Sequence, residues 1–342
     1  LLCCALVLLL SACGEAKSTT QQIFAMDTVM DLTAYGKKAD DGINAAISII
    51  NSMDTLLDPE NERSKTYEIN HAMGSPVVVN EQIAKMLRTA LTVYERTNGA
   101  FDLTTYPLSK LWGFIDQNYR VPSDAEIERL LPCVDMSKVQ LAATDDSANS
   151  LVTMPADMAL SFGAVAKGCA SDYAIQAMRA AGVTSGVVSL GGNVQTLGKK
   201  PDGSDWRVAV KDPADPSEFL GVLTAADTFV VTSGIYERGF EENGVRYHHI
   251  IDPKTGKPAE SGLVSVTVVC GDGAWADALS TACFVLGEAG SLALRDTLAA
   301  EKNLCIELIL VTDDGHVRYT AGLAERFEPS EEGTYVYEAI IA

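Results

Sequence analysis

The chain has 342 residues, of which 47% are hydrophobic and 21% charged, and it carries a formal net charge of −20. This composition excludes a disordered chain and supplies enough apolar side chains for one large domain or two smaller ones. The negative charge excludes nucleic acids and anionic lipid surfaces as electrostatic partners. An anionic substrate would therefore need a local cation, for example a metal ion.

The first residues form an apolar run that is too short to span a membrane and ends in small residues before Cys13. The sequence Leu-Ser-Ala-Cys at its end resembles a bacterial lipobox, in which cleavage precedes a lipid-bearing cysteine. We expect residues 1–12 to be part of a lipoprotein signal peptide that lacks its start, and residues 13–22 to be the lipidated cysteine with a polar tether. The protein would then be extracytoplasmic and anchored to the bacterial cell membrane. The alternative is a plain cleaved secretion signal.

Five cysteines follow Cys13 at wide spacings, and we interpret them as small buried hydrophobic residues. Their odd number does not suggest a disulfide framework, and no spacing of cysteine and histidine indicates zinc. They are Cys133, Cys169, Cys270, Cys283 and Cys305.

The spacing of apolar residues and the position of turn residues predict the secondary structure. The first half is expected to hold a strand over 23–35, helices over 40–57, 81–97 and 122–131, a polar loop over 58–70, and two strands within 134–153. The second half is expected to hold strands over 187–193, 206–211, 219–224, 228–231, 264–270, 305–311, 316–320 and 335–341, with helices over 169–181, 274–282 and 292–298.

One stretch of the second half gathers hydroxyls, two histidines and an acid between turn residues. An apolar strand is expected to reach a corner at 232–234, and Asn243-Gly244 predicts a hairpin whose second strand, 245–251, folds back. The turn at 252–256 then delivers His249 to one end of a sheet. The alternative is that the two adjacent histidines face opposite sides of a strand, one buried and the other solvated.

Residues 160–168 lead from a strand into a helix and contain two glycines and Lys167. Glycine lets a backbone approach a ligand closely, a helix N-terminus favours an anion, and the lysine adds a positive charge. The alternative is a tight turn with a solvated lysine.

Asp277 and Thr281 are four residues apart and would share one face of a helix. A carboxylate and a hydroxyl in this arrangement offer two oxygen ligands to a hard cation such as Mg²⁺. The alternative is a local capping arrangement at a helix start.

Several motifs together resemble the FAD:protein FMN transferases, the ApbE-type flavin transferases. They are TSG-x-YER…YHHIIDP-x-TG over 232–256, GAFD-x-T over 99–104, the run 160–168, LGGN over 190–193 and AD-A-x-x-T over 276–281. The chain departs from the family where Asp27 and Ser161 replace the usual Gly and Asp, and where Asp58-Pro59-Glu60 replaces an aromatic residue. The matches run in the family's order through nearly all of the mature chain.

The resemblance implies an α+β fold over 23–342, with mixed, largely antiparallel sheets, flanking helices and a tunnelling-fold-like architecture. It implies Mg²⁺-dependent transfer of FMN from FAD to a Thr or Ser hydroxyl of an extracytoplasmic acceptor protein, with release of AMP. The acceptors of the family are often membrane redox proteins with a short [ST]-G-A-[ST]-x-[ST] sequence. The absence of a Rossmann fingerprint agrees with FAD as a substrate rather than a resident redox cofactor.

His249 is the catalytic candidate, either to deprotonate or to orient the incoming hydroxyl, because a neutral imidazole near pH 7 can accept a proton. The resemblance also implies roles for other residues. The flavin nucleotide would be bound by Met26, Ala100, Phe101, Asp102, Ser161, Lys167, Gly191, Gly192, Thr232, Ser233, Gly234, His249, Ile251 and Asp252. The metal would be bound by Ala164, Asp277, Ser280 and Thr281, the first through its backbone carbonyl. Two rival functions remain, an FAD pyrophosphatase that gives FMN and AMP, and a non-enzymatic flavin-binding lipoprotein.

Overall fold

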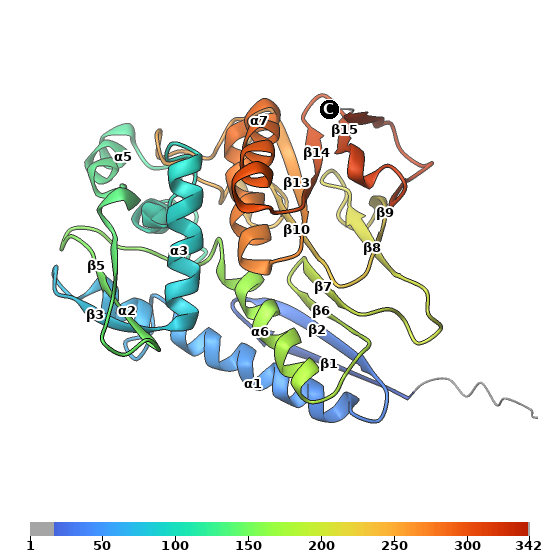
Figure 1. The fold of residues 1–342 in the computed structure, drawn as a ribbon. Helices are drawn as coiled ribbons and strands as arrows, with labels where there is room; N and C mark the ends of the chain where they lie inside the picture. Colours follow the sequence, from blue (N-terminus) through green and yellow to red (C-terminus); the bar gives the residue numbers. More distant parts are fainter. Residues whose placement is uncertain (1–16, 341–342) are drawn as a thin grey trace, which may run out of the picture.

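A computed structural model of the chain describes residues 17–340, shown in Figure 1. It confirms the α+β class: a nine-stranded mixed sheet and three small antiparallel sheets are flanked by helices. The predicted signal peptide and the predicted lipidation site at Cys13 lie outside the described residues.

The large sheet has the strand order β1-β2-β6-β7-β10-β13-β14-β15-β17, so β1 and β17 form its two edges. All neighbouring strands are antiparallel except β15 and β17, which are parallel. The strands are β1 (Ser18–Ala25), β2 (Thr28–Tyr35), β6 (Gly186–Leu190), β7 (Asn193–Leu197), β10 (Phe229–Gly234), β13 (Leu263–Cys270), β14 (Ile306–Thr312), β15 (His316–Thr320) and β17 (Val336–Ile340).

Three helices cover one face of this sheet and bury the main hydrophobic core against it (Figure 1). They are α1 (Ala39–Leu57), α6 (Ala166–Ala180) and α7 (Gly273–Lys302). The helix α7 is interrupted at Gly287, whose φ of 72° is not helical. It is long and apolar enough to span a membrane, but 56% of its most apolar window is buried, as suits a core helix.

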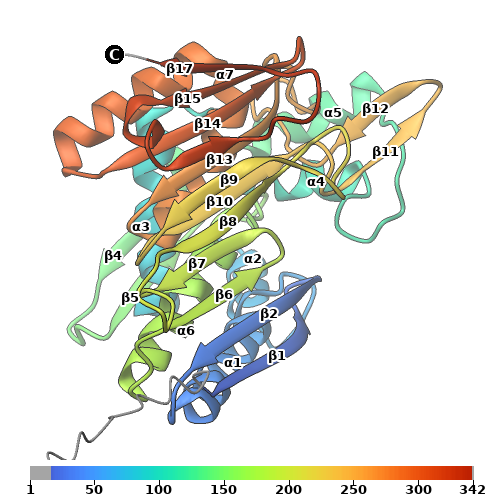
Figure 2. The same cartoon turned by 90° about the vertical axis from the view of Figure 1, so that its right-hand side faces the viewer.

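A small sheet covers part of the opposite face (Figure 2). It consists of β16 (Phe327–Pro329), β9 (Phe219–Ala225) and β8 (Trp206–Lys211), in that order. Its side chains, such as Val208 and Leu223, pack on Val230, Val269 and Ile309 of the central strands. The strands β1 and β2 lie beyond this cover, so their face opposite α1 is open.

The remaining elements form a second layer beside α7, on the other side of the helices (Figure 1). They are α2 (Lys65–Asn70), β3 (Val77–Asn80), α3 (Glu81–Arg96), α4 (Tyr106–Leu111), α5 (Asp124–Leu130), β4 (Gln140–Ala143) and β5 (Asn149–Thr153), with a separate hairpin of β11 (Gly239–Glu242) and β12 (Val245–His248). Asn80 caps α3, where its side chain accepts a hydrogen bond from the Ile83 amide.

The expected single strand over 23–35 is wrong, because the structure has a hairpin there. Met26 and Asp27 form a two-residue turn with φ of 48° and 58°, and β1 pairs with β2 on either side of it. The alternation of apolar residues continues across the turn, and Met26 is not a common turn residue, so the sequence pattern does not reveal the turn. The strand β1 begins at Ser18, within the segment expected to be a tether.

Several other expectations need correction. Cys305 is exposed and Cys133 half-buried, so not all five cysteines are buried. The helices expected over 274–282 and 292–298 are both parts of α7.

The end of the predicted polar loop is the helix α2, whose cap Ser64 accepts a hydrogen bond from the Tyr67 amide at 2.9 Å. Residues 232–234 are no corner but the last half of β10, where they pair with β13. The Asn243-Gly244 turn is confirmed, although β12 pairs with β11 and not with β10.

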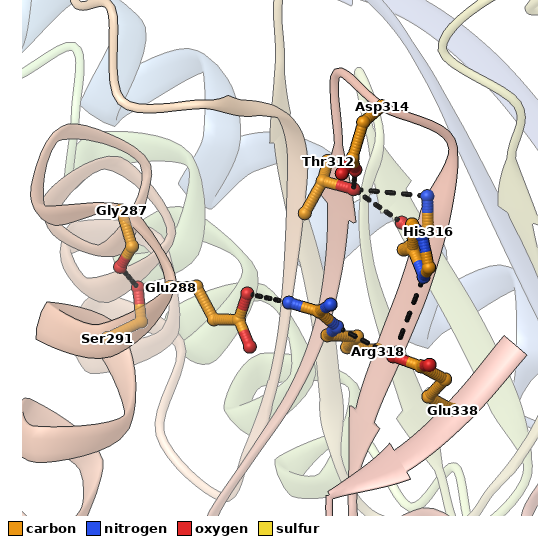
Figure 3. A network of polar contacts seen from close by, with 8 residues as sticks. All are labelled: Gly287, Glu288, Ser291, Thr312, Asp314, His316, Arg318 and Glu338. Atoms are coloured by element: carbon orange, nitrogen blue, oxygen red, sulfur yellow. Dashed lines mark hydrogen bonds and ion pairs between the residues drawn. The ribbon is translucent and has the colours of Figure 1, made fainter. Parts of the chain in front are cut away.

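Ion pairs connect β17, the C-terminal edge strand of the large sheet, to β15, and they connect β15 to α7, as Figure 3 shows. Arg318 of β15 donates to Glu288 of α7 and, at 2.8 Å, to Glu338 of β17. His316 lies 3.5 Å from the same Glu338 carboxylate. The edge strand β17 therefore carries a charged side chain that is tied to its neighbour.

Candidate active site

A cleft of about 960 Å³ lies at the end of the large sheet, between its strands and the second layer. Residues from distant parts of the chain line it, including most of those singled out from the sequence. These are Met26, Ala100, Phe101, Asp102, Ser161, Ala164, Lys167, Gly191, Gly192, Thr232, Ser233, His249, Ile251, Asp277 and Thr281. The structure thus brings the proposed flavin, metal and catalytic residues to one cavity.

Three residues singled out from the sequence are not part of this lining: Gly234, Asp252 and Ser280. The Ser280 hydroxyl is buried and bonds at 2.8 Å to both the Asp277 carbonyl and the Ser233 hydroxyl. It points toward β10, so Ser280 is not retained as a metal ligand. Asp252 instead organises its own turn, since its carboxylate accepts from the Lys254 amide and its carbonyl from the Gly256 amide.

Asp277 occupies the buried floor of the cleft, in the second turn of α7, with 4% of its surface exposed. One carboxylate oxygen accepts a hydrogen bond from the Gly168 amide of α6 at 2.9 Å. The other accepts from the Asn193 side-chain amide of β7, also at 2.9 Å. These two donors fix the carboxylate, and each oxygen retains acceptor capacity for one more partner.

The donors around Asp277 suit a hard cation. Thr281 adds a hydroxyl one turn later on α7, and Ala164 lines the cleft just before α6. Among residues 17–340, no three His, Cys, Asp or Glu side chains come together as a metal cluster. A metal ion here would have one carboxylate and otherwise neutral oxygens as protein ligands. Mg²⁺ is commonly bound by so few protein ligands when phosphate and water complete its coordination shell.

The helices α6 and α7 meet through two glycines beside Asp277. A Cβ added to Gly168 would lie 1.9 Å from the Gly273 carbonyl oxygen, and one added to Gly273 would lie 2.1 Å from the Gly168 carbonyl oxygen. Only glycine allows this approach, and the approach is what lets the Gly168 amide reach the Asp277 carboxylate.

We expect Gly168→Ala to lower the free energy of unfolding by at least about 1–3 kcal/mol, because the methyl group forces the two helices apart. Urea denaturation measures this. The matched control is Gly163→Ala, where the added Cβ meets only the Ser161 hydroxyl at 3.6 Å. Equal stability of the two variants would contradict the close packing of α6 on α7.

Two turns form a rim of the cleft. Gly191 and Gly192, with φ of 58° and 100°, connect β6 to β7 and lie next to the Met26–Asp27 turn. A Cβ on Gly191 would come within 2.4 Å of the Thr28 hydroxyl, so both the positive φ and the crowding require glycine. The Met26 amide donates to Asp54 of α1 at 2.8 Å, which holds the first turn in place.

The charge of the lining is negative overall, with seven carboxylates against three cations. The cations are Lys167, Lys211 and Arg238. Arg238 lies 3.6 Å from Asp27, the residue that replaces the family's glycine. Among the described residues Lys167 forms no ion pair, so it is available to an anion, but it cannot balance the acids alone. An anionic substrate therefore needs an added cation, as the net charge of the chain suggested.

His249 follows β12 and reaches the cleft beside Ile251. Its Nδ1 lies 3.2 Å from the Arg238 carbonyl oxygen, which only accepts, so Nδ1 carries the proton and Nε2 is the free base. Burial, together with the charges of Arg238 and Lys167, lowers the pKa of His249 to about 3. The imidazole is therefore neutral at physiological pH.

The neighbouring His248 has no place in the cleft, in agreement with strand alternation. It is buried, its Nε2 lies 3.1 Å from the Ala259 carbonyl oxygen, and its ring packs edge-on against Phe284. The two adjacent histidines thus have different roles, one in the core and one at the site.

Three polar residues of the site were not predicted from the sequence to have a function. Asn193 orients Asp277, and Asn70 exchanges two hydrogen bonds with the Leu160 backbone, at 2.9 Å and 3.0 Å, just before Ser161. Glu237 lines the cleft, where its surroundings raise its pKa to about 7, chiefly by desolvation. Asn193 and Glu237 stand within quoted motifs, which was their only signal, whereas Asn70 stands at the end of the predicted polar loop.

The carboxylate of the motif residue Asp102 forms hydrogen bonds within the protein and stabilises a loop of the cleft. Its carboxylate accepts hydrogen bonds from the Thr104 amide at 2.7 Å, the Thr104 hydroxyl and, at 2.9 Å, the Met136 amide. These bonds hold the loop that places Phe101 in the lining. Burial raises the pKa of Asp102, so its environment favours such an internal role.

Comparison with known proteins agrees with this site. Residues 26–303 match the model of the ApbE family. The chain is 32% identical over 334 residues to an FAD:protein FMN transferase of Treponema pallidum, covering 92% of this chain and 91% of the relative. It is 34% identical over 293 residues to one of Klebsiella pneumoniae, covering 85% and 88%.

Solved structures give the same result for the fold. The crystal structure of an ApbE protein from Thermotoga maritima superposes with a TM-score of 0.78 at 32% identity, over 92% of this chain and 97% of that one. The flavin transferase ApbE from Vibrio cholerae gives a TM-score of 0.76 at 24% identity, over 92% and 98%, which supports the fold alone.

Proposed function

The chain belongs to the ApbE family of flavin transferases, and from this premise we propose that it transfers FMN from FAD to a Thr or Ser hydroxyl of an extracytoplasmic acceptor protein in a Mg²⁺-dependent reaction. The observation that supports this best is the convergence of Asp277, Lys167 and His249 on one cleft. A cation-binding carboxylate, a free ammonium group and a neutral base are the groups that phosphoryl transfer to a hydroxyl requires.

FAD would lie along this cleft with its pyrophosphate at the N-terminal end of α6. Lys167 stands in the first turn of that helix, so its charge and the helix dipole act in the same direction on an anion. The flavin ring would lie among apolar and aromatic residues of the lining, namely Phe101, Tyr106, Phe114 and Ile251. These take the place of the aromatic residue that the chain lacks at 58–60.

The proposed reaction is a direct displacement at the phosphorus on the FMN side of the pyrophosphate. The acceptor hydroxyl oxygen forms a bond to this phosphorus, and the bond from the phosphorus to the bridging oxygen breaks. AMP leaves with the bridging oxygen, and the hydroxyl proton passes to Nε2 of His249. The products are AMP and an acceptor that carries FMN through a phosphoester bond.

Asp277, Thr281 and the Ala164 carbonyl would hold the metal ion. Mg²⁺ bound there supplies charge neutralisation for the pyrophosphate oxygens and for the leaving AMP. The excess of carboxylates in the lining makes this cation necessary for anion binding, and the Asn193 and Gly168 donors keep Asp277 in the orientation that serves it.

We expect EDTA to abolish FMN transfer and added Mg²⁺ to restore it, because Lys167 alone cannot offset the acidic lining. Transfer is measured as flavin fluorescence on a peptide that contains Ser-Gly-Ala-Thr-Ala-Thr, separated by gel electrophoresis. FAD binding in EDTA, followed by quenching of flavin fluorescence, should weaken as well. Full transfer in EDTA would contradict the metal assignment.

The location rests on Cys13, which we propose as the lipid anchor. An anchor would keep the enzyme on the same membrane surface as its acceptors and raise their effective concentration. We expect the wild-type protein to partition into the detergent phase and Cys13→Ser to lose this partitioning. A variant that still partitions into detergent would contradict lipidation at this residue.

A further inference from the structure

The edge strand β1 lacks the features that usually protect a sheet edge. Its eight residues, STTQQIFA, include no charge and no proline, and its register with β2 is regular throughout. Natural sheets commonly block exposed edges with charges, prolines or bulges, because an open edge pairs with other chains. Within residues 17–340, only β2 pairs with β1, so its outer edge is open.

The hairpin geometry determines which amides face this open edge. In a hairpin closed by a two-residue turn, the flanking residues form a hydrogen-bonded pair, and such pairs recur at every second position. The bond from the Gly36 amide to the Lys17 carbonyl, 2.8 Å long, fits this register. The backbone groups of Thr20, Gln22 and Phe24 therefore point away from β2.

The end of β1 nearest the cleft is apolar and exposed. Phe24 is 72% exposed and its cross-strand partner Val29 is 49% exposed, yet both line the cleft. Both side chains lie on the same face of the β1–β2 hairpin, because cross-strand partners share a face, and their exposure shows that this is the face not buried against α1. An apolar surface is thus continuous with the site of chemistry, as is common where a partner binds.

The other edge of the large sheet is different. There Glu338 of β17 is paired with Arg318, and the same arginine is tied to α7 (Figure 3). A charged residue on that edge discourages pairing with a further strand. Of the two edge strands, only β1 contributes residues to the lining of the cleft, so it is the edge that lies beside the site.

We propose that β1 is the docking strand for the acceptor protein. An extended acceptor segment pairs with the outer edge of β1 as an additional strand, packs an apolar side chain on Phe24 and Val29, and delivers its hydroxyl residue into the cleft. From Ser18 to Phe24 the strand offers a pairing length of roughly 20 Å, at about 3.3 Å per residue. The proposal rests on the transfer reaction proposed above, which requires a protein acceptor next to the cleft.

Hydrogen exchange of the full chain in detergent micelles tests the pairing without requiring turnover. The probe is the synthetic peptide with the sequence Ser-Gly-Ala-Thr-Ala-Thr, flanked by apolar residues. We expect the amides of Thr20, Gln22 and Phe24 to exchange quickly in the free protein and at least about tenfold more slowly with the peptide, since each gains a hydrogen-bond partner. Unchanged exchange at saturating peptide would overturn the proposal.

A matched pair of variants tests the same point in transfer assays. Gln22→Pro removes one outward amide, and proline is tolerated where an edge amide faces solvent. Gln22→Ala removes the same side chain, including its bond to Asp31, but keeps the amide. We expect Gln22→Pro to raise the KM for the peptide about tenfold relative to Gln22→Ala, with FAD binding unchanged in both. Phe24→Ser should raise this KM as well.

The outcomes separate the docking proposal from the proposed function. Absence of FMN transfer by the wild type would reject the function, while slow exchange of the β1 amides with peptide would still support docking. Equal KM values for the proline and alanine variants would overturn docking even if transfer proceeds. The β1 amides could also exchange slowly in the absence of peptide, to a degree that depends on protein concentration. This result would show that a second copy of the chain pairs with the edge, and it would overturn the docking proposal.

Discussion

Asp277→Ala is expected to lower the rate of FMN transfer by about 10²–10³, because the electrostatic stabilisation of the reacting pyrophosphate depends on the cation that this carboxylate holds. The apparent affinity for Mg²⁺ should fall together with the rate. Single-turnover transfer, measured against Mg²⁺ concentration, reports both quantities. Because Asp277 also accepts bonds from Gly168 and Asn193, circular dichroism must show that the fold is retained.

Two further variants make the test specific. Asp277→Asn keeps an oxygen that can accept from the Gly168 amide but removes the charge, so it should be as inactive as the alanine variant and better folded. Ser280→Ala removes a hydroxyl that points away from the cleft toward Ser233, and it should leave the Mg²⁺ dependence unchanged. Wild-type rates in Asp277→Asn at low Mg²⁺ would place the metal elsewhere.

His249→Ala is expected to slow transfer by about 10²–10⁴ while FAD binding stays within a factor of about two, because a general base acts only as the bond to the acceptor forms. His249→Asn is the matched variant, since its amide can still donate to the Arg238 carbonyl in place of Nδ1. Equal losses in both variants would assign the effect to the missing Nε2. Recovery in the asparagine variant would show instead that His249 acts by holding its loop.

The pH dependence follows from the lowered pKa of His249, which lies at about 3 in the fold. A base must be unprotonated to accept a proton, and this imidazole stays neutral at any pH above about 4. The pH–rate profile of the wild type should therefore have no inflection near pH 6.5 that is caused by His249. Any inflection there should also be present in His249→Ala. An inflection that disappears in His249→Ala would mean that His249 retains the pKa of a solvated histidine.

Two long helices and several strands were predicted closely, and the strands β8 and β15 have the expected bounds, 206–211 and 316–320. The helices α1 and α3 follow apolar residues at helical spacing, and the structure places their ends within a residue or two of the expected positions. The β1–β2 hairpin was missed because its turn begins at Met26, a residue type that rarely takes positive φ, and contains no glycine. The helix α2 was missed because its six residues are too few to show a period.

The site was predicted by motif more than by spacing. Helical spacing placed Asp277 and Thr281 on one face but could not separate Thr281 from Ser280, which lies only one residue away along the same helix. The structure separates them, since Ser280 is buried against β10 and Thr281 lines the cleft. The roles of Asn193 and Asn70 depend on contacts across 84 and 90 residues of sequence, which a local pattern cannot reveal.

Transfer of FMN to a protein and hydrolysis of FAD give different ratios of products, so these ratios distinguish the two reactions. Purified protein is incubated with FAD, Mg²⁺ and the acceptor peptide, and mass spectrometry quantifies AMP, free FMN and flavinylated peptide in the same sample. We expect one AMP for each flavinylated peptide, no accumulation of free FMN, and loss of both products in Asp277→Asn. Release of AMP with an equal amount of free FMN and an unmodified peptide would contradict the proposed transfer.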